Sequence, residues 1–107
     1  MRQVVQGDVI QTFEVTYDLC WKAIFRSLRE QQNTKMEPQM SRKEILCLAG
    51  KCHLIDHAEE WLQFHSQRNN TSHNYDENLV NETVILAGSL LQEAKILLRN
   101  LKHEKDA

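Results

Sequence analysis

Residues 79–101, LVNETVILAGSLLQEAKILLRNL, carry the longest regular pattern in the chain and decide its fold. Apolar residues recur there at steps of three and four, the spacing that puts side chains on one face of an α-helix. The spacing predicts one long amphipathic helix that begins near Asp76. Its near-heptad stripe consists of Leu79, Thr83, Leu86, Leu90, Ala94, Leu97 and Leu101.

A second long pattern of the same kind lies near the start of the chain. It predicts a helix over about residues 5–31, whose stripe consists of Ile10, Phe13, Tyr17, Trp21, Ile24 and Leu28. Residues 32–40 lose this periodicity and contain the only proline, Pro38. A loop is predicted there.

Two shorter helices are predicted between this loop and the last helix. Ser41 and Glu44 have the spacing of a capping box, which begins a helix that ends near residues 54–55. Asp56 and Glu59 offer a second cap, for a helix over about residues 57–68. The polar run at residues 69–72 competes for its own backbone hydrogen bonds, so we predict a turn there.

Length and composition favour one helical domain. The chain has 107 residues, only three Gly and one Pro, and 41% apolar residues. Four amphipathic helices of this kind can bury their stripes only against each other. We therefore predict an all-α, antiparallel four-helix up-and-down bundle over residues 1–107, with residues 1–9 and 103–107 frayed. The stripe of the last helix is long enough to serve a second chain, so a dimer is expected.

Charge and hydropathy exclude several classes of function. The formal charge of −2 provides no global basic field, so we expect no DNA partner, and any RNA contact needs a local patch. The apolar runs fall short of the ~20 residues that span a bilayer, so no membrane association is expected. Gln6, Gly7 and Asp8 interrupt the first apolar residues, so we predict no secretory signal and a cytoplasmic location.

The thiols and imidazoles of Cys47, Cys52, His53 and His57 are the usual ligands of zinc and lie within eleven residues. Positions five apart on one helix diverge by roughly 140°, which points Cys47 and Cys52 to different faces. Buried apolar cysteines are the favoured interpretation, and no metal is expected. The odd count of three cysteines also argues for reduced thiols rather than disulfides.

Two further groups have an ordinary interpretation and a functional one. Trp21 and Trp61 lie on apolar stripes, where indoles mostly supply core area rather than stack on bases. Arg42, Lys43 and Lys51 fit a solvated face better than a track for RNA.

The segment 68–75, RNNTSHNY, collects chemically active side chains where the helical periodicity stops. A metal-independent ribonuclease needs a base with a pKa near 6.5 for the ribose 2′-hydroxyl, which His73 offers, and a cation for phosphorane charge, which Arg68 offers. Alternatively, Arg68 pairs with helix-end carbonyls while His73 and Tyr75 are ordinary turn residues. Spacing alone favours this second interpretation, because an Arg and a His five residues apart occur often by chance.

A wider pattern surrounds this segment. Its four blocks are IQTFEVTYDLCWK at 10–22, SRKEI at 41–45, LID at 54–56 with EEWL at 59–62, and RN, TSH and YDE between 68 and 77. Together they resemble the HEPN proteins encoded beside minimal nucleotidyltransferases, whose signature is Arg-x4-His-x-Tyr. The resemblance covers nearly the whole chain after Gly7.

This resemblance implies a function and a set of site residues. It implies a homodimer in which two copies of Arg68 and His73 face a shared cleft, with Asn69 and Ser72 in support. In that family the cleft is a metal-independent RNase site without a cofactor, and the protein acts as a toxin on RNA. The implied antitoxin is the neighbouring nucleotidyltransferase, which in that family transfers AMP from ATP to the tyrosine that matches Tyr75.

Two points from the same resemblance leave alternatives open. An older interpretation makes such proteins the non-catalytic, substrate-binding subunit of a two-component nucleotidyltransferase, although that label rests on fold analogy. Relatives also carry another helix before the first block, whereas only nine residues precede Ile10 here. The bundle is therefore expected to be one helix short.

Overall fold

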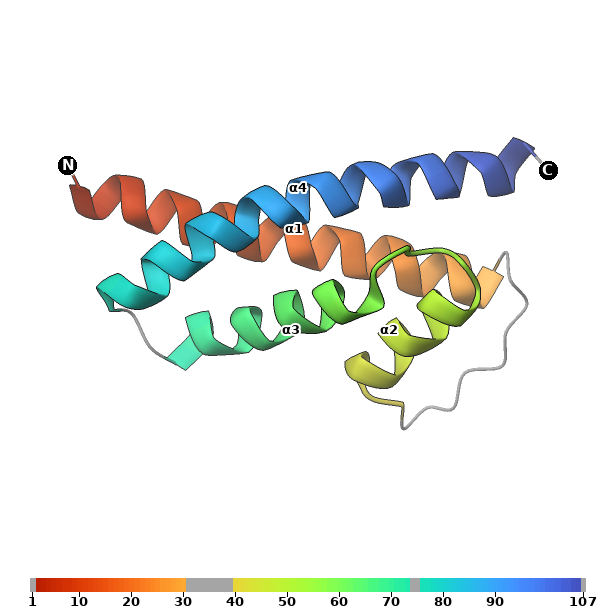
Figure 1. Ribbon diagram of the computed structural model, residues 1–107, viewed down its shortest axis with the longest axis horizontal. Helices are drawn as coiled ribbons and strands as arrows, with labels where there is room; N and C mark the ends of the chain where they lie inside the picture. The colour runs from red at the N-terminus through yellow and green to blue at the C-terminus, as the bar shows by residue number, and fades with distance from the viewer. Residues whose placement is uncertain (1, 31–39, 74–75, 107) are drawn as a thin grey trace.

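The computed structural model describes residues 2–30, 40–73 and 76–106, and their side chains over 9–30, 40–71 and 76–103. These residues form four helices and no strand, which confirms the all-α prediction (Figure 1). The helices are α1 (Arg2–Glu30), α2 (Arg42–Lys51), α3 (Ala58–His73) and α4 (Glu77–Asp106). Residues 31–39, most of the predicted loop, lie outside the described residues.

The three long helices pack side by side, and α2 lies across one end of them (Figure 1). Helix α3 runs opposite to both α1 and α4, whereas α1 and α4 run in the same general direction. The strict alternation of an up-and-down bundle therefore does not extend to α1 and α4. The cause is the length of α2, because its 10 residues reach only about 15 Å and cannot carry the chain back along the 29 residues of α1.

One core fills the space between the helices. The stripe predicted for α1 faces inward, with Tyr17, Ile24 and Leu28 fully buried. Trp61 is also fully buried, as predicted, and meets Phe64 edge-to-face at 5.4 Å between ring centroids. Trp21 departs from its prediction, because it is only partly buried at the edge of this core.

Helix α2 begins as predicted and ends earlier than predicted. Ser41 and Glu44 make the reciprocal bonds of a capping box. The helix stops at Lys51 because the next turn closes a Schellman motif, in which the Leu54 amide bonds to the Ala49 carbonyl and the His53 amide to that of Gly50. His53 takes the left-handed position of this motif, with φ of 60°. A histidine there gives no sequence signal of a helix end.

Helix α3 runs five residues further than predicted, through the polar segment that was expected to turn. Thr71 accounts for the extension, because it is buried and its hydroxyl donates both to the Arg68 carbonyl and to Glu14 of α1. The start of α3 also differs from its prediction. Asp56 binds Asn100 of α4 through its side chain, and the amides of the first turn bond to the His57 carbonyl.

Helix α4 matches its prediction closely. The Asp76 carboxylate accepts the Leu79 amide at 2.7 Å, which caps the helix where the sequence indicated. The near-heptad stripe faces the other helices, with Thr83, Leu90 and Leu97 buried. Residues 2–9 and 103–106 are helical parts of α1 and α4, and their fraying stays a prediction. Within the described residues, no helix is long and apolar enough to cross a membrane.

Candidate functional site

Arg68 is the centre of a charged cluster between α3 and α1. Its guanidinium donates to Glu14 at 2.8 Å and to Asp18 at 3.3 Å, one helical turn apart on α1. The Arg68 side chain keeps 27% of its surface exposed, so solvent reaches it. The two carboxylates therefore fix the orientation of the Arg68 guanidinium, because its planar set of N–H donors can bond to both of them.

Glu14 ties a second α3 residue into the same cluster. The oxygen that accepts from Arg68 also accepts the Thr71 hydroxyl at 2.8 Å. These contacts join α1 to the last turns of α3, the part of the chain where sequence reasoning predicted a turn. The helical extension of α3 and the placement of Arg68 thus have one common cause.

Asp18 brings a second arginine to this cluster from α2. Arg42 lies 3.7 Å from the Asp18 carboxylate, and its guanidinium sits 4.9 Å from the centre of the Trp21 ring. Asp18 therefore stands between Arg42 and Arg68, although the two arginines come from different helices. Sequence reasoning assigned Arg42 to a solvated face and did not place it beside Arg68.

A hydrogen-bonded pair, Tyr17 and His65, lies beside the charged cluster. The Tyr17 hydroxyl is 3.1 Å from His65 Nδ1, and Asn69 Nδ2 is 3.4 Å from His65 Nε2. Burial lowers the pKa of His65, and the positive charges of Arg42 and Lys43 lower it further, so the ring is neutral near pH 7. A neutral ring can accept a hydrogen bond from the Tyr17 hydroxyl at Nδ1.

The structure places the residues predicted for the site as follows. Arg68 and Asn69 lie on α3, and the backbone of Ser72 and His73 forms its last residues. The side chains of Ser72 and His73 and the whole of Tyr75 fall outside the described part of the chain.

Sequence reasoning missed the two acids that hold Arg68. Glu14 and Asp18 are four residues apart on one side of α1, next to Tyr17, and this spacing of carboxylates was the available signal. Nothing in the sequence alone pairs them with a residue fifty positions away. Only the packing of α1 against α3 does so.

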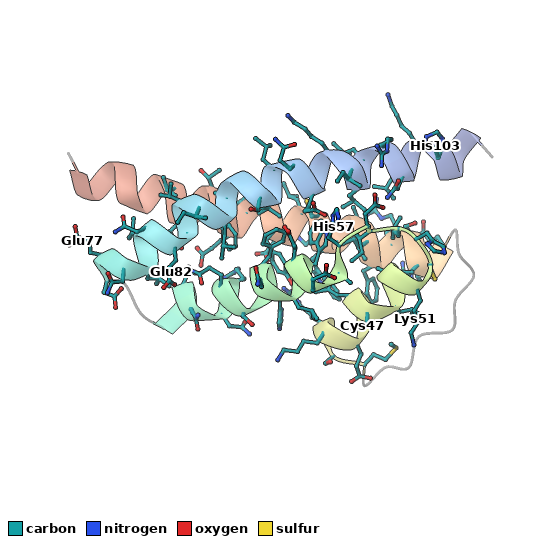
Figure 2. The ribbon with its side chains drawn as sticks, in the orientation of Figure 1. Cys47, Lys51, His57, Glu77, Glu82 and His103 are labelled. Carbon is teal, nitrogen blue, oxygen red and sulfur yellow. The ribbon has the colours of Figure 1, made fainter. Side chains whose placement is uncertain are left out.

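The cysteines differ from the prediction of buried apolar residues. Cys47 is exposed on α2, four residues before Lys51 (Figure 2), and Cys52 is partly buried. Burial raises the pKa of Cys20 to about 11, which keeps that thiol protonated. Among the residues with described side chains, no three of the types His, Cys, Asp and Glu form a group suited to a metal ion.

Comparisons with known proteins place the chain in a family. The model of the family described as "Nucleotidyltransferase substrate binding protein like" matches residues 1–103, so the chain belongs to this family. The chain is also similar to the probable ribonuclease HepT of Haemophilus influenzae, with 32% identity over 94 residues. The match covers 87% of this chain and 64% of that relative. The resemblance to HEPN proteins is thereby confirmed. No solved structure matches the chain.

Proposed function

We propose that this protein is a metal-independent endoribonuclease, the toxin of a HEPN and minimal nucleotidyltransferase pair. The observation that carries the proposal is the Arg68 guanidinium, oriented by Glu14 and Asp18 at the start of the Arg-x4-His-x-Tyr signature. The relative named a probable ribonuclease supports the same reaction. A preorganised cation is what a phosphoryl transition state requires, because it stabilises charge without reorganising during the reaction.

The two site residues have separate tasks in this reaction. His73, as the base, takes the proton of a ribose 2′-hydroxyl, and the freed oxygen attacks the adjacent phosphorus. Arg68 stabilises the charge that develops on the phosphoryl oxygens while the bond from phosphorus to the 5′-oxygen breaks. The departing 5′-oxygen takes a proton from water, and the hydroxide that remains takes the proton held by His73, so the base is restored and a cyclic phosphate is left on one RNA fragment. No metal ion takes part in these steps.

A homodimer in the cytoplasm completes the proposed site. Six large apolar side chains are exposed on α1 and α4, namely Val15, Leu19, Val84, Ile85, Leu91 and Leu98. A second copy of the chain covers such a stripe in a two-fold arrangement. In the proposed dimer, two copies of Arg68 and His73 face a shared cleft.

Control of the activity is proposed to occur at Tyr75. The neighbouring nucleotidyltransferase transfers AMP from ATP to the Tyr75 hydroxyl and releases pyrophosphate. The added nucleotide carries a phosphate and a bulky base close to the site, where it occupies the place of an RNA phosphate. The same motif then holds the catalytic pair and its switch.

The second candidate function is a non-catalytic subunit that presents substrate to the nucleotidyltransferase. The description of the matching family favours it. Under this alternative, the Arg68 cluster holds an anionic substrate and cuts nothing. Cleavage of RNA by the isolated chain separates the two functions.

The test measures RNA cleavage by the purified chain with and without EDTA. We expect cleavage that EDTA leaves unchanged, and its loss in His73→Ala and in Arg68→Lys. Lysine is the sharper change at position 68, because it keeps a positive charge beside Glu14 and Asp18 and removes only the fork of donors. The matched controls are Arg26→Lys and His103→Ala, two exposed positions outside the site. Inhibition by EDTA, or full activity in both site variants, contradicts the mechanism.

A further inference from the structure

The cluster around Asp18 contains more cations than the proposed reaction uses. Asp18 Oδ2 accepts from Arg68 at 3.3 Å, and Oδ1 lies 3.7 Å from Arg42. Two arginines from different helices therefore converge on one carboxylate. A phosphate is the ligand that two converging guanidinium groups recognise best, because each offers a planar set of donors to its oxygens.

The stacking contact of Arg42 fixes where its charge lies. Its guanidinium is 4.9 Å from the centre of the Trp21 ring, and the Trp21 ring is itself held against Phe25 at 5.9 Å. The Arg42 side chain nevertheless remains 42% exposed. It is thus oriented by its neighbours and still open to a ligand from solvent.

The distances indicate which carboxylate a phosphate replaces. Glu14 is bound tightly, at 2.8 Å to Arg68 and 2.8 Å to Thr71. The contacts of Asp18 are all longer, between 3.3 and 3.7 Å, and its side chain is 33% exposed. Bonds of that length are weak, so Asp18 gives way first while Glu14 continues to hold Arg68.

We propose that Arg42 is a second phosphate-contacting residue of the RNA site, and that Asp18 occupies the position between Arg42 and Arg68 until an RNA phosphate replaces it. This inference rests on the proposed RNA-cleaving function and deepens it. It extends the site from α3 across α1 to the first turn of α2. The phosphate that replaces Asp18 then contacts both guanidinium groups.

The salt dependence of RNA binding tests this proposal directly. Each phosphate contact contributes about 0.7 to the slope of log affinity against log salt concentration for single strands. Binding of a single-stranded RNA oligonucleotide of mixed sequence is measured in the His73→Ala background, where no cutting is expected. Arg42→Gln should lower that slope by about 0.7 and weaken binding at low salt by roughly tenfold, the effect of one charge-assisted hydrogen bond.

Two further variants separate a phosphate contact from a structural role. Arg42→Lys keeps the charge and should keep the slope, although binding weakens because the fork and the stacking on Trp21 are lost. Lys51→Gln removes the same charge at the far end of α2 and should leave the slope unchanged. If Arg42 only ties α2 to α1, Arg42→Gln changes the free energy of unfolding and leaves the slope as it was, which overturns the proposal. An equal fall of the slope in Lys51→Gln also overturns the proposal, because it shows that any positive charge on α2 attracts RNA without a specific phosphate contact.

The outcome for the parent chain separates this proposal from the proposed function. A parent that cuts RNA, with an unchanged slope in Arg42→Gln, overturns the role of Arg42 alone. A parent that binds RNA without cutting it overturns the ribonuclease, and the slope still decides the role of Arg42. A parent that neither binds nor cuts RNA overturns both.

Discussion

At the scale of single residues, Glu14 connects stability to the site. One of its oxygens accepts from both Arg68 and Thr71 at 2.8 Å, and the side chain is only 25% exposed. Its charge therefore compensates the partly buried guanidinium of Arg68. Sequence reasoning identified the cation and could not identify this acid, because the pair forms only when α1 and α3 pack.

Glu14→Gln should lower the free energy of unfolding by about 1–3 kcal/mol. Glutamine keeps the shape and one oxygen acceptor, but it leaves Arg68 with less compensating charge in a partly buried position. Urea unfolding followed by circular dichroism measures the change. Glu82→Gln provides the matched control, since Glu82 is exposed on α4 (Figure 2) and should shift the midpoint very little. Equal midpoints for the two variants would contradict the role of Glu14.

His57, the residue just before α3, forms a second charged contact. Its Nδ1 lies 3.0 Å from Oε1 of Glu93, a side chain that is only 7% exposed, and Figure 2 shows His57 beside α4. The hydrogen bond and the negative charge of Glu93 raise the pKa of His57. The imidazolium and the carboxylate therefore join the start of α3 to α4.

The raised pKa of His57 predicts a pH dependence of stability with a definite sign. The folded state holds the proton more tightly than the unfolded state, so this contribution is fully present below the ordinary histidine pKa of about 6.5. It is lost as the pH rises through the raised pKa of the folded protein. Imidazole NMR titration should show a pKa of His57 above the ordinary histidine value of about 6.5, and Glu93→Gln should bring it back toward that value. If Glu93→Gln leaves the pKa of His57 unchanged, Glu93 is not the cause of the raised pKa.

At the scale of elements, the sequence predicted which helices form better than where they end. The periodic stripes of α1 and α4 and the caps at Ser41 and Asp76 are local signals, and the structure confirms them. The end of α3 was missed because its polar residues are stabilised by α1, through Thr71 and Glu14. Local propensity cannot register a partner on another helix. The contacts of the candidate site are therefore the hardest to predict from sequence, because the residues that position it come from three helices.

The end of α2 gives a prediction at this scale. His53 has φ of 60°, a left-handed position that costs a residue with a Cβ roughly 1–2 kcal/mol. Glycine avoids this steric cost in the folded state. It also increases the conformational entropy of the unfolded chain, which cancels part of the stabilisation. His53→Gly should therefore raise the free energy of unfolding by about 0.5 kcal/mol.

A matched glycine elsewhere should have the opposite effect. Gln92 is also exposed, but it lies in the middle of α4, where glycine costs roughly 1 kcal/mol. Thermal unfolding should therefore move the two variants in opposite directions from the parent. A lower melting temperature for His53→Gly would show that the histidine side chain stabilises this turn by a contact of its own.

At the scale of the whole molecule, α4 has two apolar stripes, and among the described residues only one of them packs against other helices. The inward stripe packs against the other helices. The second stripe is exposed at Val84, Leu91 and Leu98, a heptad spacing, with Gly88 between them on the same face. A Cβ at Gly88 would meet nothing within 4 Å, so this face is uncovered in the single chain. A heptad seam with a small residue is a surface on which a second helix can approach closely.

The last prediction is that this exposed seam is the interface of a homodimer and that RNA cleavage depends on this dimer. Leu91→Glu puts a charge at the centre of the seam. In a two-fold dimer the new carboxylates of the two copies lie close together, so desolvation and the repulsion of like charges both destabilise the dimer there. Light scattering at micromolar concentration should give a dimer for the parent and a monomer for Leu91→Glu. Gln92→Glu adds the same charge one residue along, about 100° around the helix, and should remain dimeric.

RNA cleavage should also be lost in Leu91→Glu, because the proposed cleft needs Arg68 and His73 from both copies of the dimer. A monomeric parent would remove the shared cleft from the mechanism, whereas a monomeric variant that cuts RNA at the rate of the parent would place the whole site within one chain.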